Sequence, residues 1–211
     1  MEQNTQSPSN MRRVAIDPVT RVEGHGKITL LLDDQNHIHE ARFHIVEFRG
    51  FEKFIQGRPY WEVPFIVQRL CGICPVSHQL AAAKAVDQLV GVERLTPTAE
   101  KLRRLLHFGQ VLQSHALHFF HLSSPDLLFG FGSDPAQRNI AGVLDKYPDL
   151  AMKGVMLRKF GQQIIAAISG KRIHGTATVP GGMNKPLSAA ERDALLVDIR
   201  DILAWCQDAL E

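Results

Sequence analysis

Two cysteines and a histidine fall within one short stretch, and their spacing constrains the fold more than any other feature of the sequence. Cys71 and Cys74 are separated by two residues, so both sulfurs can bind one ion, and Gly72 permits the tight turn between them. Pro75 suits the first turn of a helix, where its missing N–H has no partner to lose. His78 then lies about one helical turn beyond Cys74, so its imidazole can return to the sulfurs. The stretch predicts a turn followed by a helix, with a soft-metal site at their junction.

The spacing alone leaves several interpretations open. A lone C-x-x-C also fits half of a structural zinc site or a dithiol redox motif, and two thiols can simply be buried and inert. Zinc normally takes a second pair of ligands, and the third cysteine, Cys206, is isolated. A thioredoxin-like motif should follow a strand, whereas the residues before Cys71 have a helical pattern. Arg69, just before the pair, would favour thiolate over thiol.

Composition excludes several classes of function. The 211 residues carry a formal net charge of +2 with the charges interspersed, so there is no basic tract to favour nucleic acid. No apolar run approaches the roughly 18 residues of a membrane span. No apolar export signal follows Arg12-Arg13, so the cytoplasm is the expected location. Three cysteines, an odd number, indicate reduced thiols rather than a disulfide framework.

Two patterns of hydrophobicity divide the chain. Residues 27–32 and 38–48 are rich in β-branched and aromatic residues and flank a turn-forming loop, which predicts an antiparallel hairpin. After Pro75 the apolar residues recur at helical spacing. We therefore predict an α+β fold, in which a small N-terminal antiparallel sheet is followed by a mainly α-helical bundle. The predicted regions are a disordered tail at 1–12, a β-rich region at 13–58 and a helical bundle region at 59–211 that carries the cysteine motif. Helices are predicted at 53–57, from Pro59 to the cysteine loop, and at 75–90, 98–121, 135–146, 148–168 and 188–210.

The helix predicted at 98–121 has apolar residues nearly all round, which is typical of a helix that is central to a bundle or clasped by a partner. Its last part carries His115, His118 and His121 at intervals of three, so the three imidazoles could share a stripe. From the residues alone these histidines are either metal ligands or packed side chains.

Five stretches of this sequence resemble nickel-iron hydrogenase large subunits. Residues 69–78 are similar to the N-terminal cysteine motif of that family, R-x-C-G-x-C-x-x-x-H. The other four follow in the family's order, at 17–25 (DPVTRVEGH), 47–54 (EFRGFEKF), 113–122 (QSHALHFFHL) and 179–182 (VPGG). The resemblance extends over nearly the whole chain and is greatest to the soluble, bidirectional NAD-reducing branch. It implies the fold of the large subunit in incomplete form and favours packed histidines on the long helix.

The resemblance also implies a metal site. In the family, four cysteine thiolates hold nickel, and two of them bridge to an iron that carries carbon monoxide and cyanide. By this resemblance Cys71 is a terminal nickel ligand, Cys74 is a bridging ligand, and His78 hydrogen-bonds a bridging sulfur. Glu23 corresponds to the glutamate of an R-I/V-E-G-H motif that carries protons to and from the metals, and Glu52 to a carboxylate that binds magnesium. From position alone, both glutamates would be solvated surface residues.

The implied activity is the reversible oxidation of H2 to protons and electrons. Once Cys71 and Cys74 are assigned, only Cys206 is left, and one thiol cannot hold an iron–sulfur cluster that normally takes four. Electrons are therefore expected to pass through an iron–sulfur small subunit to a flavin-containing, NAD-reducing diaphorase module, with NAD, flavin and clusters all on partner subunits. An extensive apolar face of this chain is expected to dock the small subunit, and a maturation chaperone is expected to bind it beforehand.

One departure from the family limits these expectations. The second cysteine pair of the family, D-P-C-x-x-C-x-x-H, does not occur in the sequence. The chain is therefore expected to be the N-terminal part of a catalytic subunit and to be inactive alone. Two alternatives remain open. The chain could be a cofactor-free structural subunit related to the quinone-pocket subunit of respiratory complex I, or it could be a zinc-binding interaction module. The complex I relative lacks the cysteine pair, which argues against the first.

Overall fold

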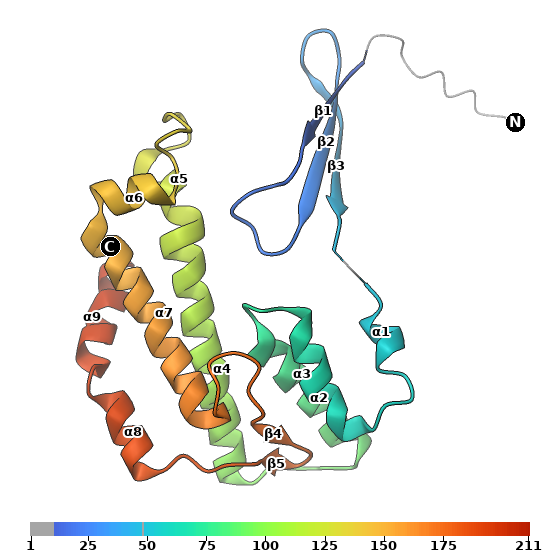
Figure 1. Ribbon diagram of the computed structural model, residues 1–211, viewed down its shortest axis with the longest axis vertical. Coiled ribbons are helices and arrows are strands. Elements are labelled where there is room, and N and C mark those ends of the chain that lie inside the picture. The colour runs from blue at the N-terminus through green and yellow to red at the C-terminus, as the bar shows by residue number, and fades with distance from the viewer. Residues whose placement is uncertain (1–10, 48) are drawn as a thin grey trace, which may run out of the picture. The chain divides into compact units, whose positions relative to one another are not determined.

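The computed structural model describes residues 11–47 and 49–211, drawn in Figure 1. The chain divides into two compact units, with the boundary after Gly50. The first unit is a small antiparallel sheet and the second is mainly helical, which confirms the predicted α+β class. The predicted tail, residues 1–12, lies outside the described residues except for its last two, and Arg12 already belongs to a strand.

Three antiparallel strands form the sheet of the first unit, in the order β1-β2-β3. They are β1 (Arg12–Ile16), β2 (Gly26–Leu32) and β3 (Ile38–Ile45). The β2–β3 hairpin closes where the sequence predicts it, because the carboxylate of Asp33 accepts hydrogen bonds from the backbone N–H groups of Gln35 and His37, both at 2.9 Å. β3 ends at Ile45, before the predicted limit, although the N–H of Val46 still donates to the carbonyl oxygen of His25 at 3.3 Å. The predicted limit itself, Phe48, lies outside the described residues.

One face of this sheet is apolar and open. The register pairs Ile28 of β2 with Phe43 of β3, so apolar side chains of neighbouring strands lie together on that face. Phe43 is 63% exposed and Ile45 is 71% exposed. On the opposite face Thr29 is buried, and its hydroxyl lies 2.8 Å from Nε2 of His44. No other described part of the first unit covers these side chains, which an alternating strand normally buries.

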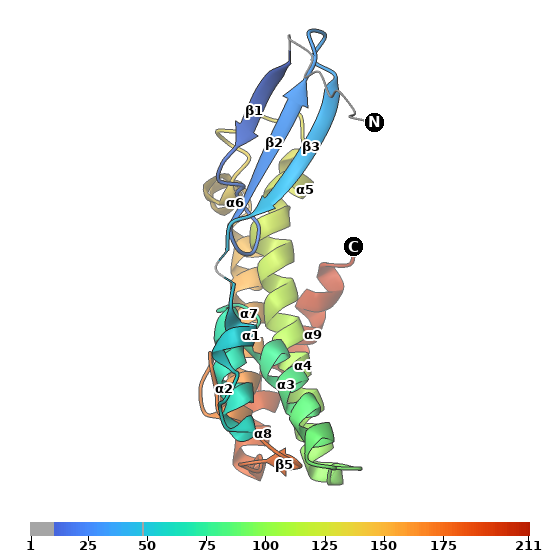
Figure 2. The same cartoon turned by 90° about the vertical axis from the view of Figure 1, so that its right-hand side faces the viewer.

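Two long helices lie side by side in the second unit and run in opposite directions (Figures 1 and 2). They are α4 (Pro97–Leu117) and α7 (Pro148–Ser169). Gly109 and Gly161 face each other across the pair. A Cβ on Gly161 would stand 2.6 Å from the carbonyl oxygen of Gly109 and 2.7 Å from the backbone nitrogen of Gln113. Only glycine fits here, so the backbone that carries Gln113 is held directly against α7.

The core of the second unit is formed by these two helices together with α3 (Pro75–Leu89) and α9 (Ile199–Asp208). Leu106 of α4 is 0% exposed, Ile165 of α7 is 2% exposed and Ile202 of α9 is 5% exposed. Burial of one such side chain stabilises the fold by about 1.5–3 kcal/mol. Because α4 packs against both α3 and α7, its nearly continuous apolar circumference meets partners on more than one side.

The remaining elements of the second unit are short. They are α1 (Phe51–Phe54), η1 (Tyr60–Glu62), α2 (Val63–Val67), η2 (Gln68–Leu70), η3 (His118–Ser123), α5 (Ser124–Phe129), α6 (Ile140–Lys146), β4 (Thr178–Val179), β5 (Gly182–Met183) and α8 (Ala189–Leu196).

Five predicted helices differ from those observed. The helix predicted at 53–57 is α1, which ends at Phe54, and the helix predicted from Pro59 to the cysteine loop is divided into η1, α2 and η2. The helix predicted at 188–210 is broken into α8 and α9, because Asp198 leaves the helical conformation and becomes the N-cap of α9. The helix predicted to begin at residue 135 begins only at Ile140, where the side chain of Asn139 accepts the N–H of Gly142 at 3.1 Å. The end of the long helix, from His118, is the π-helix η3. The sequence analysis did not predict α5 or the β4–β5 hairpin.

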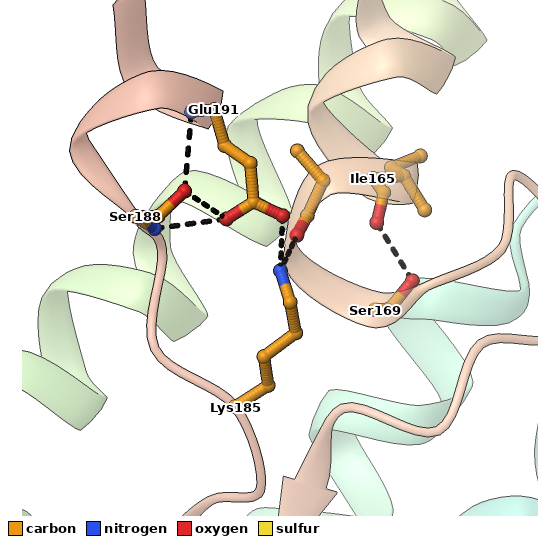
Figure 3. A network of polar contacts seen from close by, with 6 residues as sticks. Ile165, Ser169, Lys185, Ser188 and Glu191 are labelled. Carbon is orange, nitrogen blue, oxygen red and sulfur yellow. Dashed lines mark hydrogen bonds and ion pairs between the residues drawn. The ribbon is translucent and has the colours of Figure 1, made fainter.

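The joint between α7 and α8 is a polar network (Figure 3). The amine of Lys185 donates to the carbonyl oxygen of Ala167 at 2.6 Å, near the end of α7, and to the carboxylate of Glu191 at 2.5 Å. Ser188 and Glu191 form a capping box at the start of α8. The hydrogen bond from Lys185, assisted by those from Ser188, lowers the pKa of Glu191 to about 2. The start of α8 is thereby fastened to the end of α7.

A buried ion pair fastens the β4–β5 hairpin to α3 and α4. The guanidinium of Arg103 on α4 binds both carboxylate oxygens of Asp87 on α3, and the two side chains are 10% and 9% exposed. Nη2 of Arg103 also donates to the carbonyl oxygens of Val179 and Gly182, each at 3.1 Å. The N–H of Gly181 donates to Oδ1 of Asp87 at 2.8 Å. Each charged group therefore also holds the backbone of the hairpin.

Candidate metal centre

Two thiols and an imidazole meet where η2 gives way to α3. The sulfurs of Cys71 and Cys74 and a ring nitrogen of His78 all lie within 4.8 Å of one another. Cys71 follows the last residue of η2, Cys74 is the N-cap of α3, and His78 lies one turn into α3. The three side chains that the spacing singled out are therefore brought together by a turn and a helix, as that spacing predicts.

Local hydrogen bonds set the turn between the two cysteines. Cys71 has an extended backbone, which ends η2, and the N–H of Cys74 then donates to the sulfur of Cys71 at 3.1 Å. Pro75 opens α3 at a position where no backbone N–H is needed. The N–H groups of Ser77 and His78 donate to the carbonyl oxygen of Cys74, at 3.1 and 3.4 Å. The backbone thus holds the first sulfur beside the second cysteine and aims the first turn of α3 back toward both.

Two glutamines of α4 support this loop from behind, and the sequence analysis did not identify them. The side-chain amides of Gln110 and Gln113 donate to the carbonyl oxygen of Ile73, at 3.0 and 2.6 Å. They are 2% and 4% exposed. The available signal was the pair of amides three residues apart on a mostly apolar helix, a spacing that puts both on one face.

The donors of this cluster fit a soft, redox-active metal. Thiolates and imidazole suit nickel and iron better than they suit magnesium or calcium. The third cysteine, Cys206 on α9, is half-buried, and burial raises the pKa of its thiol. It is not a member of this cluster. The described residues thus bring together two thiols and one imidazole that could hold such a metal.

The predicted proton carrier, Glu23, lies in the first unit, in the loop that joins β1 to β2. Positive φ angles at Arg21 and Gly24 turn this loop, and it closes where the N–H of Val19 donates to the carbonyl oxygen of Gly26 at 3.0 Å. Glu23 is exposed at the loop surface of its unit. Its carboxylate is therefore carried by a loop of fixed shape and not by a regular strand.

The same loop is tied to the end of the sheet by a hydrogen bond between two side chains. Nδ1 of His25 lies 2.6 Å from Oε1 of Glu47, just beyond β3. This hydrogen bond lowers the pKa of Glu47 below its usual value. A side chain at position 24 would crowd this carboxylate, since a Cβ on Gly24 would lie 3.1 Å from Oε1 of Glu47. The two glutamate-bearing motifs around residues 23 and 47 are thus in direct contact.

Comparison with known proteins identifies the family. Residues 13–48 match the family model described as HoxL-like, and residues 49–129 match the model of the nickel-dependent hydrogenases. Over 94% of its length the chain is 51% identical to the beta subunit of the NAD-reducing hydrogenase HoxS of Cupriavidus necator. The chain belongs to the nickel-dependent hydrogenase family. This confirms the resemblance to nickel-iron hydrogenase large subunits and argues against the zinc-module and structural-subunit alternatives.

Solved hydrogenases share the fold of this family member. An NAD+-reducing NiFe-hydrogenase in its H2-reduced state is 65% identical, with a TM-score of 0.91 over 95% of the chain. The NiFeSe-hydrogenase of Dm. baculatum is 28% identical, with a TM-score of 0.76 over 92% of the chain. The chain spans 43% of the Cupriavidus subunit and 45% and 42% of the two solved chains.

Two other predicted site residues, Glu52 and Arg69, precede the cysteines in the second unit. Glu52 is exposed in the first turn of α1, and the metal-ligand cluster found among the described residues does not include it. Arg69 donates from its guanidinium to the carbonyl oxygen of Phe65, on the preceding turn. The structure thus places Arg69 against its own helical segment. No helix among the described residues is long and apolar enough to span a membrane.

The three histidines of the long helix have different environments. His115 and His118 are exposed, and Nδ1 of His115 lies 2.9 Å from the carbonyl oxygen of Val111. His121, in the π-helix η3, is half-buried, and burial lowers its pKa. Among the described residues they form no metal-ligand group.

Proposed function

We propose that this hydrogenase chain supplies two of the four thiolate ligands of a nickel–iron centre that reversibly oxidises H2. The observation that carries the proposal is the convergence of two sulfurs and an imidazole within 4.8 Å in a chain of this family. The physiological electron acceptor is NAD. Its support is the likeness to the NAD-reducing hydrogenase of Cupriavidus necator and to the solved NAD+-reducing hydrogenase.

Each residue of the cluster has a separate task. Cys71 would be a terminal ligand and Cys74 a bridging ligand of a nickel–iron centre whose iron would carry carbon monoxide and cyanide. When bound, the centre supplies a low-potential redox site at which H2 is cleaved. His78 donates a hydrogen bond to the bridging sulfur and so tunes its basicity. Arg69 adds positive charge near the thiolates, and Glu52 is an oxygen ligand to a magnesium ion, a hard cation.

The remaining cofactors are assigned to partner subunits, because the chain has three cysteines and two of them serve the metal centre. An iron–sulfur small subunit takes the electrons and passes them to a diaphorase module that holds flavin and binds NAD. Phe108 on α4 and Phe119 on η3 are 62% and 38% exposed, and they lie on the face proposed to dock the small subunit. A maturation chaperone covers this face before assembly, which takes place in the cytoplasm.

Elemental analysis of the complete purified enzyme tests the metal assignment. We expect nickel and iron in stoichiometric amounts, together with H2-dependent reduction of NAD. Zinc in place of nickel, in a protein without H2-dependent turnover, would return the cluster to the interaction-module hypothesis, since zinc and nickel–iron predict different elements.

The proton carrier is tested by Glu23→Gln. Glutamine keeps the shape of glutamate and cannot ionise, and a positioned acid or base typically contributes about 10²–10⁴-fold to a rate. We expect the variant to retain nickel and iron but to lose at least about a hundredfold in H2-dependent turnover. Glu40→Gln is the matched control, because it makes the same change on β3, where Glu40 pairs with Arg42, and should leave turnover unchanged. Near-normal turnover of Glu23→Gln would exclude the relay.

A further inference from the structure

The carbonyl oxygen of Ile73, between the two cysteines, receives two side-chain hydrogen bonds from one helix. Gln110 donates at 3.0 Å and Gln113 at 2.6 Å, so both acceptor positions of this oxygen can be used. Only the nitrogen of a side-chain amide can donate to a carbonyl oxygen, which fixes the orientation of both amides. The loop is thus held by a fork of two donors that arise nearly forty residues further along the chain.

Burying the side-chain amides of Gln110 and Gln113 costs free energy. Both glutamines are almost completely buried, and burial of an amide is unfavourable unless its hydrogen bonds are made. The oxygen of the Gln110 amide is buried and has no hydrogen-bond partner among the described residues. A methionine would fill the same space without that cost, so α4 carries an amide here at the expense of stability.

The support behind the fork is rigid. Gly161 of α7 leaves no space behind Gln113, because a Cβ on Gly161 would lie 2.7 Å from the backbone nitrogen of Gln113 and 2.8 Å from its Cβ. The backbone of Gln113 therefore cannot move toward α7. Hydrogen bonds from a rigid helix to one carbonyl can hold a loop in place more firmly than hydrogen bonds within the loop alone.

We propose that Gln110 and Gln113 are positioning residues that set the separation of the Cys71 and Cys74 sulfurs by clamping the Ile73 carbonyl. The clamp holds the middle of the loop, and the hydrogen bond from the N–H of Cys74 to the Cys71 sulfur holds its ends together. The two thiols are then presented to a metal in one arrangement. This proposal rests on the proposed function, since it assigns the clamp to the nickel ligands.

The test compares Gln110→Met and Gln113→Met with Gln79→Met in the complete hydrogenase. Gln79 on α3 is a matched control, because it is 1% exposed and donates to the carbonyl oxygen of Gly175 at 2.8 Å, outside the cysteine loop. The first measurement is the rate of nickel loss to a chelator. Partners that orient metal ligands typically contribute about 10–100-fold to metal affinity. We expect nickel loss to accelerate by about that factor in the Gln110 and Gln113 variants only.

The second measurement is the hydrogen exchange of residues 71–74, which needs no metal. We expect faster exchange in the Gln110 and Gln113 variants and wild-type exchange in Gln79→Met. Unchanged nickel loss with unchanged exchange would overturn the clamp, as would an equal effect in Gln79→Met. If the wild-type enzyme holds no nickel, the proposed function fails, and the exchange of residues 71–74 still decides whether the glutamines fix the loop. Gln110→Met and Gln113→Met are made separately, so that if one variant fails to fold, nickel loss and hydrogen exchange can still be measured on the other.

Discussion

Replacing Cys71 or Cys74 with serine in the complete enzyme is expected to abolish both nickel retention and H2 oxidation. A serine hydroxyl is a hard donor that stays protonated at neutral pH, whereas the nickel site takes soft thiolates. The loop should survive, because serine and cysteine are similar in size and the amides of Gln110 and Gln113 still hold Ile73. Nickel content and H2-dependent dye reduction measure the two losses separately.

Cys206→Ser provides the control for these cysteine variants. Its thiol lies on α9, outside the cluster, and its raised pKa keeps it neutral. We expect this variant to keep nickel and activity. The assignment of the ligands would be wrong if either Cys71→Ser or Cys74→Ser matched it.

The second large effect concerns stability. Asp87→Ala leaves the guanidinium of Arg103 buried without its counter-charge, and removal of one partner of a buried ion pair costs about 3–5 kcal/mol. The backbone N–H of Gly181 also loses its acceptor, which loosens the β4–β5 hairpin. We expect a large fall in the free energy of unfolding of the variant, measured by denaturant titration.

A surface ion pair is the matched comparison for this stability effect. Lys153 and Asp208 lie 2.7 Å apart, but their side chains are 35% and 51% exposed. Exposed pairs contribute only about 0–1 kcal/mol, so Asp208→Ala should have a small effect. If Asp87→Ala cost no more than Asp208→Ala, the ion pair would not be what fastens the hairpin.

The parts of the fold that could be predicted from the sequence depend on local pattern. The turn at Gly72, the helix that begins at Pro75 and the return of His78 to the sulfurs all follow from spacing within one or two turns. The long helices α4 and α7 were predicted because their apolar periodicity extends over many residues. The predicted start of a helix was less accurate where a single N-cap residue sets it, as at Asn139 for α6 and Asp198 for α9.

The parts that could not be predicted depend on contacts between distant segments. Gln110 and Gln113 become support for the cysteine loop only once α4 lies beside it. Their spacing puts both amides on one face of α4 but does not indicate which segment that face contacts. The ion pair of Asp87 with Arg103 likewise acquires its role from the hairpin at residues 178–183. Local periodicity predicts the helices and strands, whereas the residues that support the candidate metal site are brought to it by the packing of those helices.

The open apolar face of the sheet affects the kinetics of assembly. Phe43 and Ile45 belong to β3, which lies at the edge of the sheet, and both side chains are exposed. Edge strands with apolar side chains readily pair with another copy of the same chain. Such pairing is second order in the concentration of the chain, whereas capture by a partner in excess is effectively first order. If the chain assembles with the proposed small subunit, the yield of the assembly should therefore depend on how slowly this chain is supplied relative to that subunit, and slow synthesis should favour assembly.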